Sequence, residues 1–207
     1  MDIQFYGANC LTVTYKGNRL VIDDNLEELG GKSILRNDDV ALFTVARPES
    51  KVDLKLFADR PGEYEVGEIS IKGVAARAHM DEKGKAATMY RVTVGDINVL
   101  VVGHIYPEVS EAQLESIGPV DVMVVPVGGM GYTLDAIGAL KLIKSFEPKL
   151  VIPTHYEQKG ITYPVPQQDL SVALHELGME PKETVSKLKL KATDLTDTTQ
   201  LIVLDKS

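Results

Sequence analysis

The sequence is poor in several features that define large protein classes. Its 207 residues include one cysteine, Cys10, so the chain cannot form an internal disulfide. It has no apolar run approaching the ~18 residues of a membrane-spanning helix. Its first residues, Met1-Asp2-Ile3-Gln4, lack the basic start and apolar run of a signal peptide. We therefore expect a soluble, cytoplasmic protein with no membrane partner.

Basic residues are also in the minority. Lys and Arg number 22 against 30 Asp and Glu, which gives a formal net charge of -8. Such a surface repels the phosphate backbone, so no nucleic acid partner is expected. Hydrophobic residues at 44% and charged residues at 25% are typical of a globular protein, and the length fits a single domain over residues 1–207. Whether the chain forms a homo-oligomer is left open.

Short apolar runs separated by turn residues dominate the first half, a pattern typical of strands. The strands are expected at residues 3–5, 11–15, 19–23, 40–44, 56–58, 63–66, 69–75, 87–94 and 97–102. Gly95 and Asp96 form the expected tight hairpin turn before the last of them.

The second half alternates strands with helices. Ser110 is expected to cap a helix to Ile117, with Gln113 completing a capping box, and Thr133 to cap a helix to Phe146. The remaining elements are expected as strands at residues 122–126, 150–153, 188–190 and 201–204 and a helix at 167–177. Together the two halves predict two packed sheets with helices outside, a mixed α and β fold.

Three histidines follow predicted strands, where loops project side chains into a shared crevice. His104 and His155 come directly after strands, and His79 follows a strand after a short loop. Neutral imidazole nitrogens are natural ligands for zinc and similar ions. His79, His104 and His155 are therefore the candidate metal ligands.

Several segments, taken in order, match one family pattern. Residues 5–11 resemble its W-L-G-H-[AS]-C-F start, residues 20–23 its first aspartate strand, and residues 74–79 its P-A-x-H motif. Residues 126–129 with 133–136 resemble its glycine loop and helix start, and residues 148–156 its P-K-x-V-I-P-x-H-Y segment. The chain thus resembles the metallo-β-lactamase superfamily, and within it the ascorbate-6-phosphate lactonase-like branch of metal-dependent hydrolases. The resemblance implies an α+β fold, a four-layer αββα sandwich.

The departures from that pattern are as informative as the matches. The family's T-H-x-H-x-D-H signature corresponds to residues 44–50, Thr-Val-Ala-Arg-Pro-Glu-Ser, which keep none of its four ligands. His104 replaces the aspartate of the family's G-D-T motif. Of seven ligand positions only His79 and His155 match, so the usual two-zinc hydroxide cannot be assembled.

Two arrangements of the crevice remain open. In the first, one transition-metal ion, zinc before iron, nickel or copper, binds His79, His104 and His155. Its open water is then a nucleophile, with Glu49 as base or fourth ligand and Asp23 as the acceptor that orients an imidazole, which makes Glu49 and Asp23 the candidate catalytic residues.

In the second arrangement no metal is bound and Arg47 supplies the positive charge. The turn with Gly128 and Gly129 and the helix start at Thr133 then complete a site for a small anionic molecule. We favour this second interpretation, a divergent protein without the dinuclear zinc motif that binds a small anion and is non-catalytic. The alternative is a hydrolase with a single metal acting on a lactone, an ester or a phosphorylated small molecule.

Overall fold

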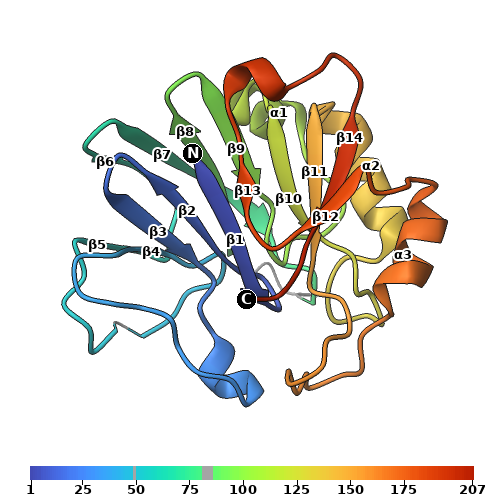
Figure 1. Cartoon of the computed structure of the whole chain (residues 1–207), viewed down its shortest axis with the longest axis horizontal. Helices are drawn as coiled ribbons and strands as arrows, with labels where there is room; N and C mark the ends of the chain where they lie inside the picture. The colour runs from blue at the N-terminus through green and yellow to red at the C-terminus, as the bar shows by residue number, and fades with distance from the viewer. Residues whose placement is uncertain (49, 81–85) are drawn as a thin grey trace.

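Two β-sheets pack against each other in the computed structural model (Figure 1), which describes residues 1–48, 50–80 and 86–207. The first sheet has six strands in the order β13-β1-β2-β3-β4-β5, and the second has eight in the order β12-β14-β11-β10-β9-β8-β7-β6. The strands of the first sheet are β1 (Asp2–Gly7), β2 (Cys10–Tyr15), β3 (Asn18–Ile22), β4 (Val40–Leu42), β5 (Leu56–Ala58) and β13 (Leu188–Lys189). Those of the second are β6 (Gly62–Val66), β7 (Ile69–Arg77), β8 (Ala86–Val94), β9 (Ile97–Val101), β10 (Val122–Pro126), β11 (Leu150–Thr154), β12 (Glu183–Val185) and β14 (Gln200–Leu204).

Burial along the strands follows their place in the sheets. In β1, partly buried and fully buried residues alternate, as in a strand with one face on the core. All five residues of β10 and of β11 are buried, and the two strands pair in parallel at the centre of their sheet. A strand covered on both faces needs the continuous apolar runs that the sequence has there.

Three α-helices follow β9 in the chain: α1 (Glu111–Ile117), α2 (Ala136–Phe146) and α3 (Leu170–Leu177). Figure 1 shows α2 and α3 on the side of the eight-stranded sheet that faces away from the six-stranded sheet. Among the described residues, the other sheet has only the short 3-10 helix η1 (Leu26–Leu29) near its β3 end, and η2 (Ala192–Asp194) precedes β14 in the chain. The prediction of two sheets with helices outside is confirmed.

Helix capping agrees with the sequence at one helix and differs at another. The Ser110 capping box with Gln113 is confirmed at α1. The prediction that Thr133 caps the next helix is wrong, because Asp135 is the N-cap of α2 and its Oδ1 accepts the Gly138 N–H at 2.7 Å. The helix predicted to begin at residue 167 begins at Leu170, and β12 was not predicted.

The cap assignment makes a stability prediction. Asp135→Ala should lower the free energy of unfolding by about 1 kcal/mol, since it removes a side-chain acceptor from an N–H that has no partner within the helix. Thr133→Val is the control, because the buried Thr133 hydroxyl has no hydrogen-bond partner among the described residues and its loss should be nearly neutral. Urea denaturation followed by circular dichroism compares the two. A larger loss of unfolding free energy in Thr133→Val than in Asp135→Ala would contradict the assignment of Asp135 as the N-cap.

Parallel pairing brings several strand ends to one region of the molecule. Strands β9, β10 and β11 run parallel, as do β3 and β4 in the other sheet. Asp23 and Thr44 lie just past the carboxyl ends of β3 and β4, and His104 and His155 just past those of β9 and β11. Loops at the carboxyl ends of parallel strands commonly form a crevice, and here they do.

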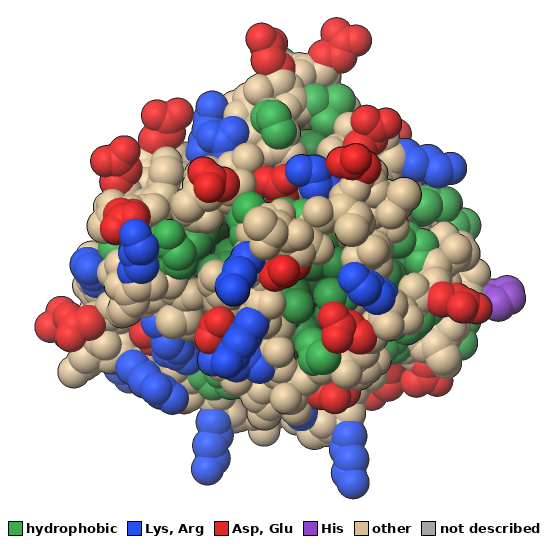
Figure 2. All heavy atoms as spheres, turned by 45° about the horizontal axis from the view of Figure 1, so that its top comes forward, with side chains coloured by type: hydrophobic (Ala, Val, Ile, Leu, Met, Phe, Trp, Pro, Cys, Tyr) green, Lys and Arg blue, Asp and Glu red, His purple; other side chains and the backbone are tan. Residues whose placement is uncertain are grey.

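The surface carries charges of both signs, and the helices are short, as the composition and the lack of long apolar runs predict. Figure 2 shows acidic and basic side chains interspersed over one face of the molecule. Among the described residues, none of the helices combines the length and the apolar character that crossing a bilayer requires.

Candidate binding site

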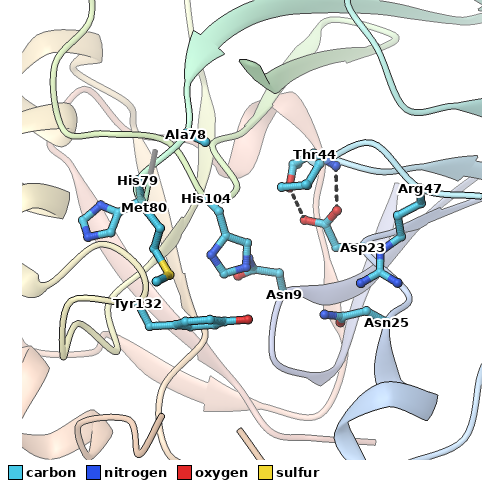
Figure 3. Close-up of a pocket in the computed structure, with 11 residues that line it drawn as sticks. Asn9, Asp23, Asn25, Thr44, Arg47, Ala78, His79, Met80, His104 and Tyr132 are labelled. Carbon is cyan, nitrogen blue, oxygen red and sulfur yellow. Dashed lines mark hydrogen bonds between the residues drawn. The ribbon is translucent and has the colours of Figure 1, made fainter. Parts of the chain in front are cut away.

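A cavity of about 240 Å³ opens where the loops of the two sheets meet (Figure 3). Its lining joins polar groups from the ends of β3, β4, β7 and β9 to apolar side chains. The lining residues are Asn9, Asp23, Asn25, Thr44, Val45, Arg47, Ala78, His79, Met80, His104 and Tyr132. Four of the residues predicted for the site are in this lining, namely Asp23, Arg47, His79 and His104.

Asp23 ties two loops together. Its Oδ1 accepts the Thr44 N–H and its Oδ2 accepts the Thr44 hydroxyl, both at 2.7 Å (Figure 3). Burial raises the pKa of this carboxyl to about 6, against the opposing effect of the two Thr44 hydrogen bonds. Among the described residues, both hydrogen bonds to the Asp23 carboxylate come from Thr44, so the partner of this carboxylate is a loop residue and not an imidazole.

His104 and His155 lie against each other. Their ring centroids are 4.7 Å apart in an edge-to-face arrangement. His155 is 1% exposed, its Nδ1 lies 3.1 Å from Gln167 Oε1, and its backbone N–H donates to Ala8 at 2.8 Å. Burial lowers the pKa of His155 to about 4, and burial, then His155 and His79, lowers the pKa of His104 well below its usual range. Both imidazoles are therefore neutral near pH 7.

His79 is joined to His104 through the backbone and not through the rings. Its N–H donates to the His104 carbonyl at 2.8 Å. Figure 3 shows the His79 ring directed away from His104, and its centroid lies 6.3 Å from that of Tyr106. Burial lowers the pKa of His79 as well.

The predicted metal ligands do not form one ligand set. Across residues 1–48, 50–80 and 86–207, no three His, Cys, Asp or Glu side chains lie so that they could hold an ion together. The reasons are local: His79 turns away, His155 Nδ1 is engaged by Gln167, and both Asp23 oxygens are engaged by Thr44. The donor set therefore does not fit a zinc ion, which needs three or four ligands at about 2 Å.

Arg47 brings the positive charge into the cavity wall. Its side chain is 25% exposed, and its Nη1 and Nη2 donate to Oε1 and Oε2 of Glu28, the second contact at 2.8 Å. The Arg47 backbone N–H donates to Asp59 Oδ2 at 3.1 Å, and its guanidinium carbon lies 5.8 Å from the Phe43 ring centroid. The hydrogen bonds that Arg47 donates to Glu28 raise the pKa of Arg47. Glu49, the other predicted group of this loop, lies outside the described residues.

Gly128, Gly129 and Thr133 of the glycine loop do not line the cavity, although Tyr132 of the same loop does. A Cβ on Gly128 would be 1.9 Å from the His155 carbonyl oxygen, and the Gly128 carbonyl accepts the Gln168 N–H at 2.9 Å. Gly129 adopts φ +63° and its N–H donates to Leu134 at 2.9 Å, while Thr133 is 1% exposed. Gly128 therefore packs against the His155 backbone, and none of the three residues predicted to bind an anion, Gly128, Gly129 and Thr133, is in the cavity lining.

Sequence reasoning missed Asn9, Asn25 and Tyr132. Asn9 is 4% exposed; its Oδ1 accepts the Thr154 hydroxyl at 2.8 Å, whereas its Nδ2 has no partner among the described residues. Buried donors without partners are rare, and each calls for an explanation such as a ligand. The only signal for Asn9 in the sequence was its position in residues 5–11, the segment that resembles the start of the family pattern.

Comparison with known proteins agrees with this architecture. A family model described as a β-lactamase superfamily domain matches residues 2–155, so the chain belongs to that superfamily. Its structure is similar to that of a metallo-β-lactamase superfamily protein from Thermotoga maritima, with a TM-score of 0.75 and 23% identity over 98% of this chain and 97% of that one. A metallo hydrolase from Ignicoccus hospitalis gives a TM-score of 0.60 with 16% identity, over 99% of this chain and 95% of that one. The predicted metallo-β-lactamase fold is confirmed.

One curated relative matches over a shorter stretch. It is a UPF0173 metal-dependent hydrolase from Carboxydothermus hydrogenoformans, 42% identical over 57 residues. The match spans 28% of this chain and 23% of the relative.

Proposed function

We propose that this protein is a non-catalytic, cytoplasmic member of its superfamily that has lost the dinuclear zinc motif and binds a small anionic molecule in the cavity. We place it nearest the ascorbate-6-phosphate lactonase-like branch, on the motif resemblance of its sequence. The observation that carries the proposal is that two donors line the same cavity, the Arg47 guanidinium and the Asn9 Nδ2, which has no partner in the part of the chain that the structure describes.

The acceptor groups of the same cavity wall also favour a negatively charged ligand. The carboxylate oxygens of Asp23 already accept two hydrogen bonds from Thr44, which leaves fewer lone pairs for a ligand's donors. Glu28 takes two of the five N–H donors of Arg47, which leaves three. A ligand with acceptor oxygens can bind the remaining N–H donors of the cavity wall. Charge-assisted contacts to a guanidinium are among the stronger hydrogen bonds.

The proposal predicts that anion binding depends on Arg47. Wild-type protein titrated with sodium acetate, sodium benzoate and inorganic phosphate should show amide shifts in ¹H–¹⁵N spectra at Asn9, Asn25 and Thr44. Arg47→Gln should weaken binding at least about tenfold, because one charge-assisted contact to an ion is worth roughly 1.5–3 kcal/mol.

Arg36→Gln is the control, since it removes the same charge from an exposed residue outside the cavity. Equal losses of anion affinity in the two variants would mean that binding depends on the net charge of the protein and not on Arg47 itself. Zinc bound at one equivalent, lost in His104→Gln, together with hydrolysis of a lactone or phosphoester by the zinc-loaded protein, would overturn the proposal in favour of a mononuclear hydrolase.

A further inference from the structure

We propose that the ligand of this cavity is a small carboxylic acid with an apolar body, and that Glu28 competes with it for Arg47. This inference rests on the proposed function, because it identifies the anion and adds a built-in competitor at the same site. It follows from the geometry of one ion pair and from the position of that pair between two cavities.

The ion pair shows which anion the guanidinium accepts. Arg47 Nη1 faces Glu28 Oε1 and Nη2 faces Oε2, so the two planar groups meet with two parallel contacts. This arrangement matches the spacing and planarity of a carboxylate. The chain thus already places a carboxylate where a ligand's acidic group would bind.

The two partners differ in how firmly they are held. The Glu28 side chain is 62% exposed and belongs to the four-residue helix η1, whereas the Arg47 side chain is 25% exposed. Arg47 also has its backbone fixed by Asp59. Exposed ion pairs contribute little free energy, so an incoming carboxylate can displace Glu28 while Arg47 stays in place.

The pair lies at the boundary of two cavities. Arg47 and Asn25 line both the first cavity and a second one of about 580 Å³, and Glu28 lines only the second. A ligand carboxylate that enters the first cavity therefore reaches Arg47 at the boundary of the two cavities, where it competes for the Nη1 and Nη2 donors that Glu28 occupies. The displaced Glu28 side chain has the second cavity and solvent in which to move.

The rest of the first cavity suits an apolar body. Val45, Ala78, Met80 and Tyr132 line it. Val45 is 43% exposed and Met80 is 63% exposed, which places two of the large exposed hydrophobic side chains of the described residues at this one cavity. A ligand that covers them removes apolar surface from water, which a bare inorganic anion cannot do.

The test uses Glu28→Gln with Glu27→Gln as its matched control. Both residues are exposed, both belong to η1, and each change removes one negative charge, but only Glu28 contacts Arg47. Calorimetric titration with sodium benzoate should give an affinity about threefold to fivefold higher in Glu28→Gln than in wild type, and within about twofold of wild type in Glu27→Gln. Benzoate should bind more tightly than acetate or inorganic phosphate, and neutral benzamide should not bind measurably.

The possible failures separate the two proposals. Equal gains in the two glutamine variants, or phosphate binding as tightly as benzoate, would overturn this inference while Arg47-dependent anion binding still stands. If no anion perturbs the cavity in wild type or in Glu28→Gln, the proposed function fails as well. Benzamide binding as tightly as benzoate would show that the carboxylate makes no contact with Arg47 and would also overturn the inference.

Discussion

Gly128→Ala is expected to leave little folded protein. The new Cβ would be 1.9 Å from the His155 carbonyl oxygen and 2.5 Å from Gln167 Oε1. The nearer atom belongs to the backbone and cannot rotate away, so β11 and the loop after it would have to move. Their movement would break the Gln168-to-Gly128 hydrogen bond and the packing around His155. We expect the free energy of unfolding to fall by more than about 4 kcal/mol, the range reserved for severe core disruption.

Gly131→Ala in the same loop is the matched control. Gly131 has φ +75° and no heavy atom within 4 Å of an added Cβ, so alanine there carries only the backbone cost of the left-handed region, about 1–2 kcal/mol. Urea denaturation followed by circular dichroism measures both variants. A Gly128→Ala protein as stable as Gly131→Ala would show that the loop is not packed against His155 and would reopen its role as an anion-binding turn.

The strands were predictable because their signals are local. Alternation in β1, the Gly95-Asp96 hairpin and the continuous apolar runs of β10 and β11 each fix an element without knowledge of its partners. The misplaced cap at α2 has a local cause too. Thr133 and Asp135 are both good capping residues, and only the packing of the preceding turn decides which side chain reaches the helix N–H groups.

The site was predictable only in part, because strand order determines which loops meet but not where a ring points. Parallel pairing was enough to bring His104 and His155 together. The direction of the His79 ring depends on its neighbours in space, and so does the engagement of Asp23 by Thr44. No sequence pattern encodes either contact.

Contacts between loops that are far apart in the sequence were the hardest feature to predict. Glu28 and Arg47 are 19 positions apart and belong to no common motif, so their pairing could be found only from coordinates. For the glycine loop the difficulty was the opposite, because its sequence fits two different roles. Its sequence is typical of a phosphate-binding turn, but the same small residues also allow the close approach of two backbones, and the structure uses them for that.

The folded protein is expected to lose stability as the pH falls from 7 toward 4.5. Burial lowers the pKa of His155 to about 4, so below the ordinary value of 6.5 the unfolded chain binds a proton that the folded chain excludes. That difference costs about 3 kcal/mol once the pH reaches 4. His104 acts in the same direction, because burial and the neighbouring histidines lower its pKa well below its usual range.

Asp23 opposes this loss. Burial raises its pKa from 3.8 to about 6, so the folded chain takes up a proton first and gains stability as the pH falls through 6 toward 3.8. This gain reaches about 3 kcal/mol only near pH 3.8 and begins below pH 6, so down to pH 4.5 it offsets only part of the His155 contribution. The lowered pKa values of His79 and His104 add to the loss. Measuring the unfolding free energy from urea titrations at pH 7, 6, 5 and 4.5 should therefore give a falling curve.

Two variants separate these contributions by slope and not by absolute stability. His155→Gln removes one excluded proton and should make the curve flatter, whereas Asp23→Asn removes the compensating proton and should make it steeper. A wild-type curve that rises toward acid, or a slope that His155→Gln does not reduce, would mean that these imidazoles are not held neutral by burial. The same result would leave positive charge beside Arg47 and change the electrostatics of the whole cavity.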